Sequence, residues 1–519
     1  MPDDLENSVI NLKLLIDEEK NKVVFAEGGK DFVDILFSFS TLPMGTIVRL
    51  LEMHQKSKAI AVGCFNNIYG SVVSMGMKHF STEACKQMLL YPGSLNQEKC
   101  QKTKLKIDDS KATKCFMCPM FVRSGQCSKG YSNFNTSRCS CGNLMDEVIQ
   151  FQGEGGRGSV GKGVEGGVFV RSGHTSSFII TDDLKVQVNS VGSTLNVLKD
   201  LGYADCDKLV EMILEVNLQE VATLLVCLFT SDTPLSDTFL KKKSSCGMKR
   251  IHKTPSPSLS EDREETKADQ TITFNAYVRK EEGNILYVEC GEDFVDLLFS
   301  FLAMPLESVW EISGRGIILG CIGNLCKSFK DLSVDSGREA SAFKCVLPHY
   351  YKCQKQLLNE VVSTHQPPTY YRFLSFSVDH FREYCLSENS GKRLVYDWDK
   401  LVPVTSIDPK NPEGNDTAES SGFVKRGTKF MVTDDLIITP SNSTSTIGFL
   451  KEKQTRLDEV EIRVINMTKE EAIRLLGASM VTSSALSTGL LAIESASTSD
   501  PQCRFFKKPK IESQTETET

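Results

Sequence analysis

One apolar stretch occurs twice in this chain. DFVDILFSFSTLP, from Asp31 to Pro43, returns as DFVDLLFSFLAMP, from Asp293 to Pro305, with nine of its thirteen positions unchanged. The stretch has almost no polar face, so we expect a helix buried on most sides that the proline ends or kinks. Asp31 and Asp293 are the expected N-caps of these helices. A core element of this kind is kept for packing, and its repetition raises the question of how much else is repeated.

The flanking sequence repeats in the same order. Two short apolar runs broken by a charged turn precede each copy and predict a β-hairpin. Later blocks also match in pairs: GCFNNIYGSV with GCIGNLCKSF, FIITDDLKV with FMVTDDLII, STLNVLKD with STIGFLKE, and a Leu-rich block at the end of each half. Because the order never changes, a duplicated domain explains the pattern better than one reused motif.

The composition between and after the copies sets the domain boundaries. We expect a first repeat domain over 8–240, a flexible linker over 241–270, a second repeat domain over 271–496 and a disordered tail over 497–519. Each half is predicted to be an α+β domain, in which a mixed or antiparallel sheet of hairpins packs on helices. A further strand is expected near Val460 to Val464. Each half carries its own core elements, so each is expected to fold independently.

Composition narrows the class of protein. The chain has 519 residues, 24% of them charged, and a formal net charge of -7, so it has no basic footprint for nucleic acid. The N-terminus lacks the features of a secretory signal, and we expect an intracellular protein, cytoplasmic or nuclear. The eighteen cysteines are then reduced thiols or metal ligands.

Two further segments bear on location. The uncharged stretch from Leu475 to Ile493 is long enough to cross a bilayer, but its Ser and Thr content and its amphipathic start favour a helix of a soluble protein without a membrane span. The basic clusters at Lys241 and at Lys507 to Lys510 are either solvated charge or nuclear-import signals.

The order of hairpin, DFVDxLFSF helix, cysteine cluster, TDDL hairpin and Leu-rich helix, present twice, resembles the plant family known as "domain of unknown function 674". The similarity covers nearly the whole chain outside the linker and the tail. It implies a plant protein with tandem copies. The family has no assigned activity, so the resemblance implies none.

The strongest chemical signal is a cysteine cluster in the first half. It contains CFMC at Cys115 to Cys118, then Cys127, then CSCG with Cys139 and Cys141. Two thiol pairs about twenty residues apart can complete the tetrahedral thiolate site that structural zinc requires. The preferred ligands are Cys115, Cys118, Cys139 and Cys141, with Cys127 as a substitute for Cys115. Plain reduced thiols are the alternative.

The second half tests the zinc hypothesis. Its corresponding region, which begins at Thr369, keeps only Cys385 and has aromatic and apolar residues instead of the other cysteines. A single zinc would therefore be structural and either dispensable for the domain or specific to the first half. A closed site of four thiolates leaves no open coordination position for catalysis.

The acidic pairs Asp182 with Asp183 and Asp434 with Asp435 occur in the matching TDDL blocks of the two halves. Each pair lies between two β-branched runs, which is typical of a hairpin turn where Asp accepts positive φ. No catalytic residue is assigned. We expect a non-catalytic interaction or scaffold protein with an unknown protein partner. The alternative is an enzyme with a cleft between the halves that uses the duplicated aspartates.

Overall fold

The computed structural model describes most of the chain, and the fold is α+β. The described residues are 8–54, 62–108, 114–124, 127, 130–151, 167–170, 177–240, 271–314, 320–333, 345–353, 357–376, 382–388, 401–412 and 422–491. The expected linker over 241–270, the expected tail over 497–519 and both basic clusters lie outside these residues. In the described part, no helix has the length and apolar character needed to cross a membrane.

The first half builds an antiparallel sheet that contains five described strands. Their order is β7 (Val186–Val188), β6 (Phe178–Thr181), β2 (Lys22–Gly28), β1 (Ile10–Asp17) and β8 (Leu209–Val216). The predicted hairpin is β1 with β2, in which Leu12 pairs with Gly28. Alternate residues of β1, such as Leu12 and Leu14, are fully buried because one face of the sheet covers the core.

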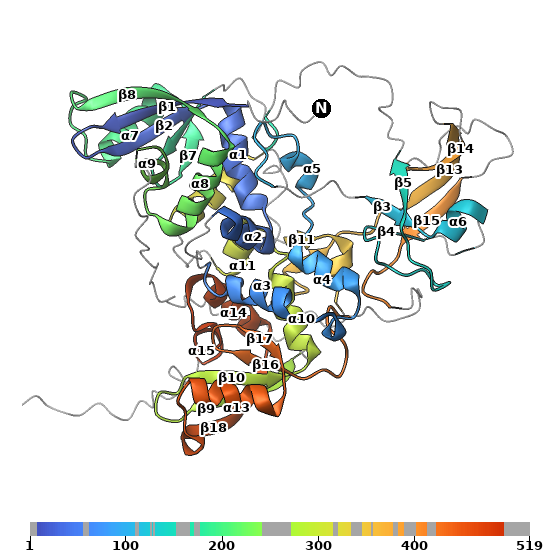
Figure 1. The fold of residues 1–519 in the computed structure, drawn as a ribbon. Helices are drawn as coiled ribbons and strands as arrows, with labels where there is room; N and C mark the ends of the chain where they lie inside the picture. The colour runs from blue at the N-terminus through green and yellow to red at the C-terminus, as the bar shows by residue number, and fades with distance from the viewer. Residues whose placement is uncertain are drawn as a thin grey trace, which may run out of the picture.

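The second half builds a sheet with the same order of corresponding strands. Its five described strands are β17 (Ile438–Pro440), β16 (Phe430–Thr433), β10 (Ile285–Cys290), β9 (Ile272–Arg279) and β18 (Val460–Met467), all antiparallel to their neighbours. Strand β18 contains the predicted strand near Val460 to Val464. The two sheets lie at opposite ends of the main body, and helices fill the space between them (Figure 1).

The helices follow a similar order along the chain in both halves. The first half has α1 (Lys30–Thr41), α2 (Met44–His54), α3 (Phe65–Ser74), η1 (Met77–His79), α4 (Glu83–Leu90), α5 (Gln97–Cys100), α6 (Pro119–Ser124), α7 (Val191–Asp200), α8 (Leu218–Thr230) and α9 (Pro234–Phe239). The second half has α10 (Glu292–Phe301), α11 (Leu306–Ile312), α12 (Cys321–Leu332), η3 (His349–Tyr351), α13 (Ser443–Glu452), η4 (Leu457–Glu459), α14 (Lys469–Val481) and α15 (Ala485–Leu490).

The repeated stretch forms α1 and α10, which are buried as predicted, but the N-caps differ from the expectation. Both helices begin before the aspartates, with Gly29 and Gly291 as N-caps, so Asp31 and Asp293 lie inside the first turn. Asp34 is buried, and its carboxylate accepts hydrogen bonds from three backbone amides of the segment 168–170, at 2.6 to 3.1 Å. It therefore anchors a distant segment rather than the start of its own helix.

One helix from each half packs against the sheet of the other half. Helix α12 lies against α1 and β7, where the amide of Val186 donates to Oγ of Ser328 at 3.0 Å. Helix α3 lies against β17 and α10, where the amide of Ile438 donates to Oγ of Ser71 at 2.8 Å. The two halves are thus interlocked through corresponding contacts.

The halves also meet where the repeated stretches end. Pro43 and Pro305 form an isolated antiparallel bridge. The amide of Met44 donates to the carbonyl of Met304 at 2.9 Å, and the amide of Leu306 donates to the carbonyl of Leu42 at 3.0 Å. The prolines, which carry no N–H, sit between these two bonds, so the chain turns there without an unsatisfied donor.

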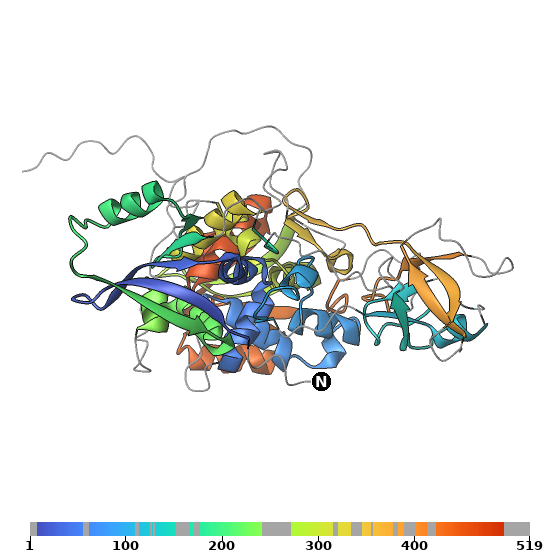
Figure 2. The same ribbon diagram turned by 90° about the horizontal axis from the view of Figure 1, so that it is seen from above.

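Both halves contribute to a small closed barrel that stands apart from the main body in both ribbon views (Figure 2). Its six described strands follow the order β13 (Tyr370–Phe376), β14 (Arg382–Ser387), β5 (Glu147–Phe151), β3 (Cys115–Met117), β4 (Gly130–Ser132) and β15 (Val402–Ser406). A separate parallel pair, β11 (Cys345–Leu347) with β12 (Val362–Thr364), belongs to the main body. The cysteine cluster lies at this barrel.

The stretch from Leu475 to Ile493 is split between two helices. Its described part lies in α14 and α15, which are joined by a turn at 482–484. Leu475 and Leu476 are fully buried in the main core, so the apolar character of the stretch serves packing within the protein.

Candidate metal centre

The first thiol of the centre is positioned by a short helix. Cys118 directly precedes α6, and its carbonyl accepts hydrogen bonds from the amides of Phe121 and Val122 at 3.0 and 3.1 Å. Pro119 starts the helix because its fixed φ suits the first helical position and its missing N–H is not needed there. This arrangement holds the Cys118 side chain, which is 1% exposed, against the barrel core.

Two further thiols come from a tight turn. The carbonyl of Cys139 accepts from the amide of Gly142 at 2.8 Å, and the amide of Cys139 donates to the carbonyl of Asn143 at 2.9 Å. Gly142 has a φ of 86°, a conformation that glycine adopts without strain. The turn places Cys139 in the core and Cys141 at the surface.

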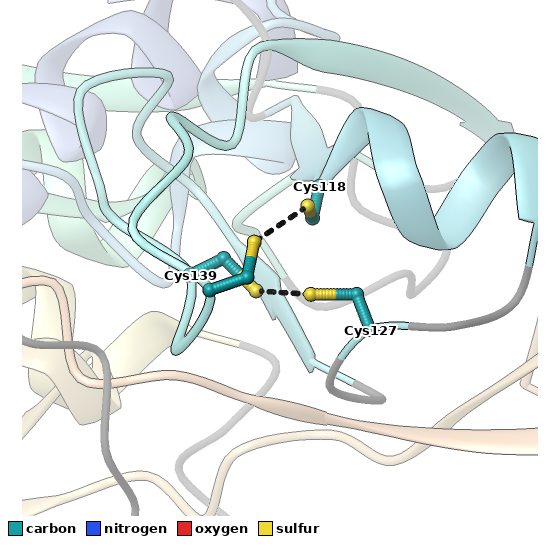
Figure 3. Close-up of side chains that lie close together, drawn as sticks. Cys118, Cys127 and Cys139 are labelled. Carbon is teal, nitrogen blue, oxygen red and sulfur yellow. Dashed lines mark hydrogen bonds between the residues drawn. The ribbon is translucent and has the colours of Figure 1, made fainter.

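Four thiols converge in the space between α6 and this turn. The Sγ atoms of Cys118, Cys127, Cys139 and Cys141 all lie within 4.8 Å of one another. Cys118 and Cys141 are 3.6 Å apart, and Cys127 and Cys139 are 3.0 Å apart. Figure 3 shows Cys118, Cys127 and Cys139 pointing toward one another. Tetrahedral zinc would separate its sulfur ligands by about 3.8 Å, so small side-chain shifts suffice to hold the ion.

Cys115 lies away from this group. It is on β3, 2% exposed, and its Sγ is 3.8 Å from Nδ2 of Asn133. Burial raises the pKa of the Cys115 thiol to about 12, which favours a neutral side chain of the barrel core. The structure therefore groups three of the four preferred ligands with Cys127, the residue considered as the substitute for Cys115. The sequence spacing favoured Cys115, but in the structure this residue lies on β3 and its side chain is buried in the barrel core.

The second-half counterpart of the cysteine cluster lies in the same barrel. Leu386 on β14 and Val404 on β15 are fully buried and pack in one cluster with Cys118 and Cys139. The guanidinium of Arg372 on β13 lies 4.4 Å from the ring centroid of Phe121 on α6 and donates to the Phe121 carbonyl at 3.2 Å. The aromatic and apolar residues of the second half thus complete the core beside the thiols.

The duplicated aspartates make structural contacts. The carboxylate of Asp182 accepts from the amide and the hydroxyl of Ser236 at 2.9 and 2.7 Å, and Asp434 accepts in the same way from Ser487 at 2.7 and 2.9 Å. These bonds attach α9 and α15 to the hairpin turns. Burial raises the pKa of both carboxyls. The positive φ in each turn belongs to Leu184 and Leu436, where aspartate was expected.

The second aspartate of each pair accepts hydrogen bonds from the helix of the other half, α12 or α3, that packs against its sheet. Nδ2 of Asn324 on α12 donates to the backbone carbonyl and to the carboxylate of Asp183, both at 2.9 Å. Nδ2 of Asn67 on α3 donates to the carbonyl of Asp435 at 2.7 Å. The pairs thus join the two halves, a role that the local sequence pattern does not reveal.

One histidine has a partner that the sequence did not indicate. Nε2 of His349 lies 2.6 Å from Oγ of Ser406 at the end of β15. Burial, with a smaller contribution from Lys410, lowers the pKa of His349 to about 4, so the imidazole is neutral at physiological pH. The ring therefore links the barrel to the main body by a neutral hydrogen bond. The two residues are 57 positions apart, and no local spacing relates them.

Fold and site together define an α+β protein with two corresponding sheets, a shared barrel and a four-thiol group suited to a metal ion. The model of a protein family described as "Protein of unknown function (DUF674)" matches residues 6–470. The chain belongs to this family, which confirms the resemblance seen in the repeated motifs. No curated protein and no solved structure matches the chain.

Proposed function

We propose that this chain is a non-catalytic interaction protein in which a structural zinc ion, held by Cys118, Cys127, Cys139 and Cys141, stabilises the barrel shared by both halves. The observation that carries the proposal is the convergence of four thiols within 4.8 Å at the edge of that barrel. Four thiolates fill the coordination sphere of zinc, so the ion would have no open position for a substrate.

The position of the thiols supports a stabilising role. Strands β3 and β4 have three residues each, too few to be stable without further contacts. The four thiols come from the segments that connect and flank these strands. A metal ion that binds the folded barrel and not the unfolded chain would add its binding free energy to the stability of the barrel.

The duplicated aspartates support the non-catalytic reading. A general acid or base must reach a substrate. The carboxylates of Asp182 and Asp434 instead accept hydrogen bonds from serines of α9 and α15. Asp183 accepts a hydrogen bond from α12. Their positions in both halves are accounted for by packing. An enzyme with a cleft between the halves has no comparable observation in its favour.

Zinc content tests the first part of the proposal. Full-length protein prepared without chelators should contain about one zinc per chain by elemental analysis. Cys127→Ser should lose the metal and lower the melting temperature, whereas Cys115→Ser should retain the metal, because Cys115 lies outside the group. Cys206→Ser, at an exposed thiol of the main body, is the matched control. A wild type without zinc would refute this ligand set. Loss of zinc from Cys115→Ser, while Cys127→Ser keeps it, would also refute it.

Partner capture tests the second part. Tagged full-length wild type, Cys206→Ser and Cys127→Ser would be expressed in cells and purified with their bound proteins. We expect a protein that is retained by the first two and lost with Cys127→Ser, because the shared barrel depends on the metal. If no protein is enriched over the tag alone, the interaction role is wrong.

We also propose that the chain arose by duplication of one domain. The shared strand order of the two sheets supports this origin, as do the corresponding contacts of Ser71 with Ile438 and of Ser328 with Val186. The cellular location is proposed to be cytoplasmic or nuclear on the basis of the thiol-rich composition.

A further inference from the structure

The four thiols of the candidate centre form two close pairs. Cys118 and Cys141 are 3.6 Å apart, and Cys127 and Cys139 are 3.0 Å apart. A disulfide brings two sulfur atoms to about 2.05 Å, so each pair needs an approach of only about 1 to 1.5 Å to form a covalent bond. The same geometry that suits a metal ion therefore also prepares two specific disulfides.

The four thiols differ in their access to solvent. Cys118 and Cys139 are buried, Cys127 is half-buried, and Cys141 is exposed at the tip of the tight turn. Its neighbours Ser140 and Gly142 are exposed as well, so a small solute can approach the Cys141 sulfur from solvent. Thiol oxidation is selective for sulfur atoms that combine thiolate character with exposure, and metal coordination keeps a cysteine deprotonated.

We propose that Cys141 is a modification site for hydroperoxides and that Cys118 resolves the product into a disulfide that opens the metal centre. The inference rests on the proposed zinc ligation. Hydroperoxide reacts first with the exposed thiol, Cys141. The buried thiol of Cys118 then forms the disulfide with it.

The chemistry balances with one hydroperoxide per disulfide. The Cys141 thiolate attacks one oxygen of hydrogen peroxide, the O–O bond breaks, and a sulfenic acid and hydroxide form. The Cys118 thiolate then attacks the oxidised sulfur, an S–S bond forms, and the S–O bond breaks with loss of a second hydroxide. Two protons convert the hydroxides to water, so the two sulfur atoms together lose the two electrons that the peroxide gains.

Loss of these two thiolates leaves Cys127 and Cys139 as the remaining ligands of the group. Two thiolates do not fill a tetrahedral site, so zinc is released. The second pair can then react with a second hydroperoxide in the same way. Both disulfides are local, which keeps α6 attached to the turn at 139–142 and makes the change reversible by a thiol or phosphine reductant.

The test uses full-length protein whose zinc content has first been measured. Hydrogen peroxide is added in stoichiometric steps, released zinc is followed with a chromogenic chelator, and peptides are mapped by mass spectrometry with and without dimedone, which traps sulfenic acids. We expect loss of one zinc per chain, a first disulfide between Cys118 and Cys141, and restored zinc binding after reduction. Dimedone should label Cys141 before the exposed Cys206, which lies outside the group.

Two variants sharpen the result. Cys118→Ser should increase the dimedone adduct at Cys141 several-fold, because the resolving thiol is missing, and Cys206→Ser should behave as wild type. If a variant does not hold zinc, the peptide map of the wild type decides which two cysteines form the first disulfide. Zinc that stays bound under peroxide, or a first disulfide between other cysteines, overturns the redox proposal. Absence of zinc before peroxide is added refutes the proposed function instead.

Discussion

The ring of Phe37 in α1 meets the ring of Phe329 in α12 edge-on, with the centroids 5.3 Å apart. Phe37 belongs to the first half and Phe329 to the second. The corresponding phenylalanine of α10, Phe299, stacks with Phe80 of the first half at 6.3 Å. Both repeated phenylalanines are fully buried, and each meets an aromatic ring from the other half.

Phe37→Ala should lower the free energy of unfolding by about 3 to 5 kcal/mol, because it removes a buried ring and leaves a cavity. Because the ring packs against α12 of the second half, the substitution should destabilise the main body of both halves and not one half alone. Thermal melts of the full chain give the measurement. A double-mutant cycle with Phe329→Ala should show a coupling of about 0.5 to 1.5 kcal/mol. An unchanged midpoint would mean that the helix is an exposed interface.

Gly63→Ala should destabilise the chain, and Gly70→Ala should not. Gly63 precedes α3 with a φ of 51°, and a Cβ there would lie 2.1 Å from the carbonyl oxygen of Ser479 in α14. Gly70 lies within α3, where a Cβ would meet nothing within 4 Å. Alanine at Gly70 should stabilise the helix by up to about 1 kcal/mol. Chemical denaturation of both variants checks the contrast, and equal effects would contradict this packing of α3 on the second half.

The stability contribution of Asp296 should fall as the pH rises toward 7. Burial raises its pKa to about 7 from an ordinary value of 3.8, although the amides of Phe423 and Val424 donate to its carboxylate. Between these values the folded chain holds a proton that the unfolded chain has released, so stability decreases by at most about 1.4 kcal/mol per pH unit. Above the folded pKa both states are ionised and the contribution is constant.

Asp296→Asn mimics the protonated carboxyl and removes this titration. The free energy of unfolding of wild type minus that of the variant should therefore decrease from pH 4.5 to 7 and then level off in urea titrations. Asp458→Asn, at an exposed ion pair, should show no such decrease over the same range. A constant difference for Asp296→Asn would contradict a protonated Asp296 in the folded chain.

Cutting the chain between the halves should not separate them. The sequence predicts that 8–240 and 271–496 each fold alone, but α3 and α12 each find their sheet in the other half, and the barrel takes strands from both. A protease site placed within 241–270 and cleaved in the folded protein should leave one species in gel filtration under native conditions. Two separate species that each keep their amide spectra would instead support independent domains.

Much of the local structure was predictable from residue patterns. Short apolar runs on either side of a charged turn identified β1 with β2 and β9 with β10, and the near absence of polar residues identified α1 and α10 as buried. Both N-caps were misplaced by two residues, because Gly29 and Gly291 cap the helices and such boundaries depend on a few weak local preferences. The cysteine spacing indicated a thiol centre and favoured Cys115 over Cys127, whereas the four thiols that lie together in the described structure include Cys127 and not Cys115.

The sequence by itself determined the repeated elements, their order and the residue types that can hold a metal, because these follow from local periodicity and composition. The tertiary structure alone decided which half each helix packs against. Asn324 and Asp183 are 141 residues apart, and their hydrogen bond exists only because α12 crosses to the first sheet. Cys115 is buried on β3 in the barrel core, whereas Cys127 is half-buried and lies in the four-thiol group. Long-range packing settles both outcomes, since the free energy of burying a helix face or a side chain depends on surfaces that meet only after the chain has folded.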